Sequence, residues 1–178
     1  MDVTDEDLFA LMHCPTCGAA MRVRTQFGNF ELQEILGAGG MGSVYRALDI
    51  NLHRQVALKV LRKEYSEKPE FIEQFAHEAA ITAHVTHPNV VKVYSSGSEQ
   101  GLFYIAMELV DKGSLDDLIT SEEKVSEAQV LELGIQVAKG LDAAVQKGLI
   151  HRDVKPGNIL FADGNTAKIV DFGLAVPI

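Results

Sequence analysis

Three short runs of alternating apolar and polar residues, joined by brief turns, constrain the fold of this chain more than any other feature. They are NFELQEIL (29–36), SVYRALD (43–49) and QVALKVL (55–61), and the glycine-rich segment AGGMG lies between the first two. Alternation with period two is typical of half-buried strands. Because only turns separate the runs, the sequence predicts three consecutive antiparallel strands.

The periodicity changes to that of a helix after residue 68. A helix is expected from about Pro69 to Val85, because Pro69 suits a first helical turn and Pro88 lies beyond the end. Two further strands are expected over 89–97 and 102–110, with a glycine-containing turn between them. These elements complete a sheet-rich first part of the chain.

A short polar link at 111–113 separates this part from a second one in which two helices are expected. The better defined helix covers 126–147, where Ser126 and Gln129 match a capping box and Gly148 can close the end. Its apolar stripe consists of Val130, Leu133, Val137, Leu141 and Val145. Short strands are expected at 159–161 and 167–170.

Composition limits the classes of partner. The 178 residues are 47% hydrophobic, with a formal net charge of −9 and a pI near 5.1. Surplus Lys and Arg drive binding to nucleic acid, so this balance argues against such a partner. No apolar run approaches the roughly 18 residues of a membrane span, and the first residues are acidic where a secretory signal is basic. We expect a cytoplasmic protein, although an anchor beyond residue 178 is compatible with the sequence.

The only two cysteines, Cys14 and Cys17, lie together in HCPTCG. This spacing suits half of a zinc site, a redox pair, or a plain turn without metal. A tetrahedral zinc site needs four ligands, so a second chain or another partner would have to complete it. The sequence leaves these alternatives open.

The segment GAGGMGSV (37–44) places Gly37, Gly39 and Gly42 between two predicted strands. Glycine lets backbone N–H groups approach a polyphosphate closely because no Cβ intervenes. A strand follows the segment where a dinucleotide-binding site would have a helix, which argues against that fold. A plain hairpin turn is the alternative interpretation.

Lys59 interrupts the apolar run VALKVL, where a charge is ordinarily costly. One interpretation is a strand residue whose ammonium reaches solvent. The other is a cation held over a nucleotide phosphate and steadied by a carboxylate, for which Glu78 on the following helix is the candidate.

The segment HRDVKPGN (151–158) must be a loop, because Pro156 and Gly157 interrupt regular structure. Asp153 can orient an attacking hydroxyl and accept its proton, while the amide oxygen of Asn158 can coordinate Mg²⁺. Asp171, in the following DFG, supplies a second hard oxygen ligand, and Lys155 can neutralise a phosphoryl group in transfer.

Together, GxGxxGxV, VALK, HRDxKPxN and DFG resemble the signature of eukaryotic-type serine/threonine protein kinases, in a form similar to bacterial members. The resemblance covers about residues 29–178. It implies that the glycine-rich turn covers ATP, that Lys59 paired with Glu78 holds its α and β phosphates, that Asp153 is the catalytic base assisted by Lys155, and that Asn158 and Asp171 hold Mg²⁺ or Mn²⁺. The remaining ATP-binding residues that it implies are Leu36, Val44, Ala57, Met107, Glu108, Val110 and Leu160.

The resemblance also implies an α+β, two-lobed kinase fold. Residues 29–110 would form a complete N-terminal lobe with a five-stranded antiparallel sheet and one helix, and 111–178 the first part of a helical C-terminal lobe. Residues 1–28 would be a leader carrying the cysteine pair, which would bring two chains together if it bound zinc.

The implied activity is transfer of the ATP γ-phosphate to a Ser or Thr hydroxyl of a protein substrate. The sequence stops five residues after Gly173, before the helices on which the family receives its substrates. We therefore expect a longer gene product, weak or no activity of this chain alone, and an exposed apolar stripe on the 126–147 helix. The alternative is a nucleotide-binding or partner-regulating module without phosphotransfer.

Overall fold

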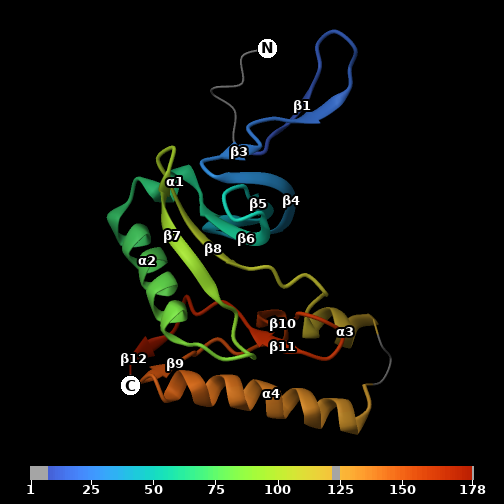
Figure 1. The fold of residues 1–178 in the computed structure, drawn as a ribbon, viewed down its shortest axis with the longest axis vertical. Helices are drawn as coiled ribbons and strands as arrows, with labels where there is room; N and C mark the ends of the chain where they lie inside the picture. Colours follow the sequence, from blue (N-terminus) through green and yellow to red (C-terminus); the bar gives the residue numbers. More distant parts are fainter. Residues whose placement is uncertain (1–7, 122–124, 178) are drawn as a thin grey trace.

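A curled six-stranded antiparallel sheet dominates the computed structural model, which describes residues 8–121 and 125–177 (Figure 1). The strand order is β3-β4-β5-β6-β8-β7. The bounds are Gln26–Phe27 (β3), Phe30–Ala38 (β4), Gly42–Asp49 (β5), Arg54–Leu61 (β6), Val93–Glu99 (β7) and Leu102–Glu108 (β8). Five strands lie where the alternation predicts them, and β3 adds a sixth. We call residues 26–110 the sheet lobe.

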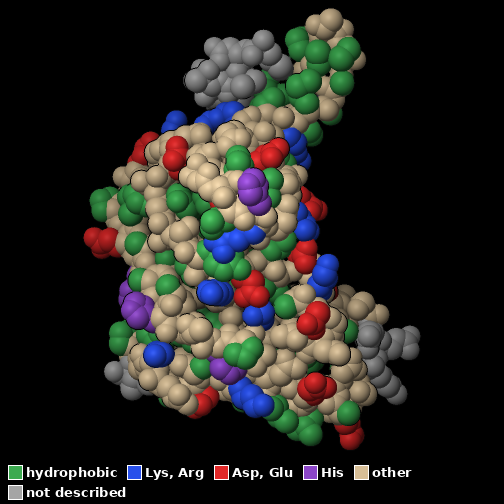
Figure 2. Space-filling model, in the orientation of Figure 1, with side chains coloured by type: hydrophobic (Ala, Val, Ile, Leu, Met, Phe, Trp, Pro, Cys, Tyr) green, Lys and Arg blue, Asp and Glu red, His purple; other side chains and the backbone are tan. Residues whose placement is uncertain are grey.

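The leader is packed onto the sheet lobe. Strands β1 (Leu11–His13) and β2 (Ala20–Arg22) form a hairpin that projects from the molecule and carries exposed hydrophobic side chains (Figures 1 and 2). Below it, the Phe9 N–H donates to Arg24 O at 3.2 Å, and Arg22 Nη1 donates to Phe9 O at 3.2 Å. Phe9 is buried. Phe9 thus belongs to the same core as the sheet.

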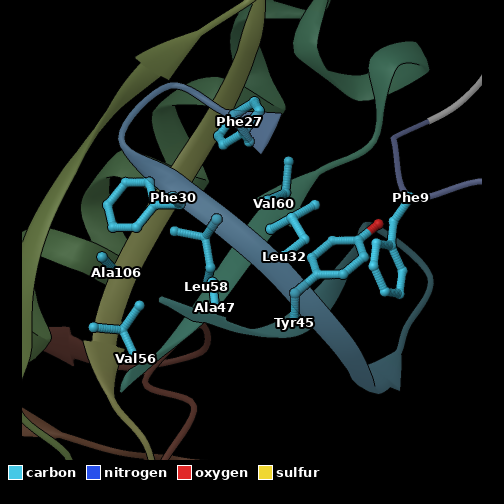
Figure 3. Packing of buried hydrophobic residues seen from close by; sticks show 10 residues of the cluster. All are labelled: Phe9, Phe27, Phe30, Leu32, Tyr45, Ala47, Val56, Leu58, Val60 and Ala106. Carbon is cyan, nitrogen blue, oxygen red and sulfur yellow. The ribbon is translucent and has the colours of Figure 1, made fainter. Parts of the chain in front are cut away.

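The main core of the sheet lobe is a cluster of ten buried side chains (Figure 3). They are Phe9, Phe27, Phe30, Leu32, Tyr45, Ala47, Val56, Leu58, Val60 and Ala106. Phe9 meets Tyr45 edge to face, with ring centroids 5.8 Å apart. Aromatic pairs favour this arrangement, which joins the leader to β5.

Helix α2 (Pro69–His84) lies along the sheet beside β7 and β8, after the single turn α1 (Lys63–Ser66). Pro69 is at the first helical position, as predicted. Its inward face packs Phe75 and Ala79 against Leu61 and Ile105 in a second apolar cluster. This packing fixes the face of α2 that carries Glu78.

Residues 111–177, the helical lobe, lie below the sheet (Figure 1). Its two helices are α3 (Leu115–Ser121) and α4 (Glu127–Val145). Ser126 caps α4 by accepting the Gln129 N–H at 3.3 Å, as the capping box predicts. Short elements complete the lobe: β9 (Leu149–Ile150), the 3-10 turn η1 (Pro156–Asn158), β10 (Ile159–Phe161), β11 (Ala167–Ile169) and β12 (Val176–Pro177).

The segment after α2 joins the lobes. Asn89 Nδ2 donates to Gln136 Oε1 on α4 at 3.0 Å and to Ala167 O on β11 at 2.8 Å. Asn89 O accepts the Ile169 N–H at 2.9 Å. At Gly140 the helix comes so close that a Cβ would lie 2.9 Å from Asn89 O. Backbone and side-chain bonds thus hold α4, β11 and the residue-89 segment as one unit.

The apolar stripe of α4 is only half covered. Leu133 is buried, and Val137 and Leu141 pack beside buried clusters. Val130, at one end of the stripe, is 57% exposed, and Val145, at the other, is 49% exposed. In the described part of the chain, no helix is both long and apolar enough to cross a membrane.

Candidate active site

Lys59 and Glu78 form the closest ion pair at the candidate site. Lys59 Nζ lies 2.6 Å from Glu78 Oε1 and 2.8 Å from Oε2. Strand β6 presents the lysine and α2 the carboxylate. Burial raises the pKa of Glu78, although the Lys59 ammonium works in the opposite direction. The Lys59 ammonium is therefore held by a carboxylate. This excludes the alternative interpretation, in which the ammonium reaches only solvent.

Asp171 reaches the same ammonium from the helical lobe. Its Oδ1 lies 3.7 Å from Lys59 Nζ and accepts the Gly173 N–H at 3.4 Å. A Cβ on Gly173 would lie 3.1 Å from Asp171 Oδ1 and 3.3 Å from Glu78 Oε2. The absent side chain at 173 thus leaves room for two carboxylates beside one cation.

Two side chains of the loop, Lys155 and Asn158, hold Asp153. Lys155 Nζ lies 2.8 Å from Asp153 Oδ2. Asn158 Nδ2 donates to the Oδ2 and the carbonyl oxygen of Asp153, both at 2.9 Å. Chiefly because of Lys155, and against partial desolvation, the pKa of Asp153 is lowered. Asp153 is therefore an ionised acceptor at neutral pH.

His151 orients the start of this loop. Its ring is buried, lies 4.5 Å from the Phe172 ring, and accepts the Asp153 N–H at Nδ1 with a separation of 3.2 Å. Nε2 lies 3.1 Å from Val170 O, which fits a neutral ring protonated at Nε2. The histidine thereby links Asp153 to the strand end that leads to Asp171.

The glycine-rich turn joins β4 to β5. The Gly39 N–H donates to Gly42 O at 2.8 Å, which closes the turn. A Cβ on Gly42 would collide with the Val60 carbonyl oxygen on β6, whereas nothing lies within 4 Å of one on Gly37. Packing against β6 therefore requires glycine at position 42. At position 37 the space beside the backbone is open.

The apolar residues expected around the nucleotide lie on neighbouring strands. Val44 is directly opposite Lys59, and Ala57 is directly opposite Met107. Val110 is buried, and Glu108 ends β8. From the helical lobe, Leu160 on β10 forms a bridge with Ser114. Leu36 is 37% exposed and lies outside the buried clusters.

The prediction of zinc at the cysteine pair is not supported. Cys14 and Cys17 lie in the β1–β2 hairpin, where bonding to Cys17 and Thr16 lowers the pKa of the Cys14 thiol. Over residues 8–121 and 125–177, no group of three or more His, Cys, Asp or Glu side chains is gathered for a metal ion. Two adjacent ligands fall short of the four that zinc takes.

Sequence reasoning passed over two features of the site. One is the Asn89–Gln136 network, for which no local pattern exists. The other is Lys168, which is buried in β11 and pairs with Glu108 at 3.0 Å. A lysine in the apolar run AKIV gave the same signal as Lys59 in VALKVL.

The fold and the site together indicate a protein kinase. The sheet lobe carries the Lys59–Glu78 pair, and the helical lobe below it presents Asp153 and Asp171. The chain matches the family model described as the protein kinase domain over residues 30–178 and belongs to this family. The predicted α+β kinase fold is thereby confirmed.

Several curated bacterial kinases are similar to the chain. Serine/threonine-protein kinase PknA of Mycobacterium tuberculosis is 41% identical over 156 residues, which cover 85% of this chain and 36% of that protein. PknB of Mycobacterium leprae is 41% identical over 150 residues, covering 82% of this chain and 24% of that protein. PrkC of Bacillus subtilis is 37% identical over 151 residues, covering 85% and 23%. The chain thus spans about a quarter to a third of the length of these relatives.

Proposed function

We propose that the protein is an ATP- and Mg²⁺-dependent serine/threonine protein kinase. The observation that carries the proposal is the convergence of Glu78 and Asp171, from different lobes, on the Lys59 ammonium at 2.6 Å and 3.7 Å. Phosphoryl transfer needs charge stabilisation and positioning more than covalent chemistry, and a cation held between two lobes supplies both. Family membership and the names of the relatives support the same activity.

The sheet lobe would bind the nucleotide. The turn from Gly37 to Gly42 would lie over the phosphates, and Lys59 would contact the α and β phosphates while Glu78 keeps it in place. Val44, Ala57 and Leu160 would enclose the adenine, next to Met107. The backbone of Glu108 and Val110 would face its polar edge.

Asn158 and Asp171 would hold the metal ion. Asn158 uses its Nδ2 on Asp153, which leaves its amide oxygen as the ligand atom, and Asp171 offers carboxylate oxygens. Both are the hard donors that Mg²⁺ and Mn²⁺ take, so these residues fit such an ion. When bound, the ion neutralises charge on the phosphate oxygens.

Asp153 would orient the acceptor hydroxyl of a protein Ser or Thr and take its proton. The lowered pKa keeps the carboxylate ionised and ready to accept. Lys155, 2.8 Å from Asp153 Oδ2, would contact the transferring phosphoryl group. The pair of Asp153 and Lys155 thus places an acceptor and a cation together at the point of transfer.

Asp153→Asn tests this assignment. In the full-length protein, we expect the variant to bind MgATP with the affinity of the unchanged protein and to lose transfer of labelled γ-phosphate to a Ser/Thr-containing protein such as casein. Asp142→Asn on α4, an exposed residue bonded to Gln146, is the matched control. Equal turnover in Asp153→Asn would sink the assignment. MgATP binding without transfer by the unchanged protein would favour the nucleotide-binding or partner-regulating module.

Pairing of two chains through a zinc ion between their leaders stays a prediction within this function. It would require Cys14 and Cys17 of one chain to meet two ligands from another. Metal analysis and the solution mass with and without chelator test it. Zinc-free protein with an unchanged mass would remove the prediction without affecting the kinase assignment.

A further inference from the structure

Lys168 is a buried cation that connects the two lobes. Its side chain is 11% exposed, that of Glu108 is 25% exposed, and Lys168 Nζ lies 3.0 Å from Glu108 Oε1. Lys168 belongs to β11, which leads into Asp171, and Glu108 is the last residue of β8. The ion pair therefore joins the strand before the candidate metal ligand to the strand end at the candidate adenine site.

The Glu108 end of this pair is fixed by the backbone of Lys92. The Glu108 N–H donates to Lys92 O at 2.8 Å, and Glu108 Oε2 accepts the Lys92 N–H at 3.3 Å. Both carboxylate oxygens thus have partners within the protein. The side chain is committed to holding the position of the backbone at residue 108.

The Lys168 end is fixed by strand pairing. Lys168 lies directly opposite Leu160, the residue expected below the adenine. The next residue, Ile169, donates its N–H to Asn89 O and accepts the Val91 N–H, both at 2.9 Å. The backbone at Lys168 is therefore held in place by the β10–β11 hairpin and by the residue-89 segment.

A buried ion pair is a weak source of stability, because the desolvation of two charges offsets their attraction. Removing one partner is costly, since the other charge stays buried without compensation. Such a pair therefore favours one arrangement over others that separate the charges. Here the arrangement is the spacing between the end of β8 and the β10–β11 hairpin.

We propose that Lys168 is a positioning residue that, through Glu108, sets the distance between the adenine end and the phosphate end of the nucleotide site. The inference rests on the proposed nucleotide function. It adds that Lys168, a residue outside the kinase signature, affects how tightly the site binds the nucleotide. ATP spans both ends, so its affinity depends on their spacing, whereas a ligand that occupies one end does not sense it.

Three ligands test the proposal on the whole chain: MgATP, adenosine and magnesium tripolyphosphate. For Lys168→Met, which keeps the stem and deletes the charge, we expect the Kd of MgATP to rise on the order of tenfold, because the two ends no longer act as one site. The Kd values of adenosine and of tripolyphosphate should change less than about twofold. Lys139→Met, at an exposed position of α4, should leave all three unchanged.

A double variant separates positioning from simple stabilisation. Glu108→Gln together with Lys168→Met removes both charges of this largely buried pair, so the melting temperature should recover toward that of the unchanged protein. MgATP binding should stay weak, because the spacing is still unset. Recovery of both properties together would overturn the proposal.

The remaining outcomes are decisive as well. Unchanged MgATP affinity in folded Lys168→Met would overturn the inference and leave the kinase assignment standing. Equal weakening of all three ligands would also overturn it, since that result indicates general loosening of the fold. If the unchanged protein binds no MgATP, the proposed function fails first and the inference falls with it.

Discussion

The two lobes differ in how they place their share of the site. In the sheet lobe, Lys59 projects from a strand whose neighbours Leu58 and Val60 are almost fully buried in one apolar cluster. In the helical lobe, Asp153 is held by Lys155, Asn158 and the His151 ring instead. The comparison teaches that apolar packing fixes one half of the site and polar bonds fix the other.

The two lobes also differ in how far apolar side chains of α4 and of the sheet core are exposed. Leu131 is 66% exposed and Ile135 is 46% exposed, while Val56 and Leu58 of the sheet lobe have no exposed surface. Leu131 and Ile135 lie off the predicted stripe, which the sequence analysis expected to be exposed and which is in fact half covered, and the sheet lobe also exposes Leu52, at 62%.

Leu58→Ala should have the largest effect, because it opens a cavity in the core that fixes Lys59. Truncation of a fully buried leucine costs about 2–5 kcal/mol, so we expect a loss in this range from urea unfolding. Leu52→Ala in the exposed turn after β5 is the control, and its loss should be below about 0.5 kcal/mol. A small loss for Leu58→Ala would mean that the sheet lobe is not the rigid half.

Gly140→Ala tests the contact of α4 and β11 with the residue-89 segment. The new Cβ would meet Ile169 Cδ1 at 2.8 Å and Asn89 O at 2.9 Å, so we expect a loss of about 1–3 kcal/mol from overpacking. Gly134→Ala, on the same helix with nothing within 4 Å of its Cβ position, should instead gain about 0.5–1 kcal/mol. Thermal or urea unfolding of both variants measures the contrast, and an equal gain in both would contradict it.

Glu78 gives the sheet lobe a pH dependence of stability. Burial raises the pKa of Glu78 in the folded protein, so the folded state holds this proton more tightly than the unfolded state. The contribution is fully present below the unfolded pKa and is lost as the pH rises through the folded pKa. Relative to Glu78→Gln, the unchanged protein should therefore lose stability as the pH rises from about 4 toward neutrality.

Urea midpoints measured across this pH range check the sign for Glu78. Glu73→Gln, an exposed position of α2, is the control and should follow the unchanged protein at every pH. A difference between Glu78→Gln and the unchanged protein that stays constant with pH would contradict the raised pKa. The lowered pKa of Asp153 has the opposite sign, because its contribution is lost as the pH falls.

How far the sequence predicts the molecule differs between its regions for physical reasons. Alternation located the strands from residue 30 to 108 because each strand has one buried face, and the Ser126 cap located the start of α4. The docking of Phe9 was missed, since its burial comes from Tyr45 across the fold and leaves no trace in the polar leader.

The candidate site shows the same limit. The short signatures named its residues because their spacing along the chain is local, as for Asp153 and Asn158, which meet at 2.9 Å. The supporting contacts connect distant segments. Asn89 meets Ala167, and Lys168 meets Glu108, and only the folded backbone brings these partners together.

Arg46→Met should have the smallest effect and completes the comparison between two ion pairs that connect the lobes. Arg46 Nη1 lies 2.8 Å from Asp111 Oδ2 in the link, and its Nε lies 3.0 Å from Glu34 Oε2. The side chains of Arg46, Asp111 and Glu34 are 29%, 17% and 60% exposed. Ion pairs that water reaches contribute little, because they are screened and the side chains lose freedom. We expect a slight fall in melting temperature at low salt.

Salt separates this connection from the buried one. The Arg46→Met difference should vanish near about 1 M salt, where charges are screened within a few ångströms. The Lys168→Met difference should shrink less, because the Lys168 side chain is only 11% exposed and salt screens partly buried pairs less. Melting curves at two salt concentrations measure both variants. If the Arg46→Met difference survived high salt, the interaction would not be a screened ion pair. Arg46 would then fix the spacing of the two lobes through the link at 111–113, as we propose for Lys168.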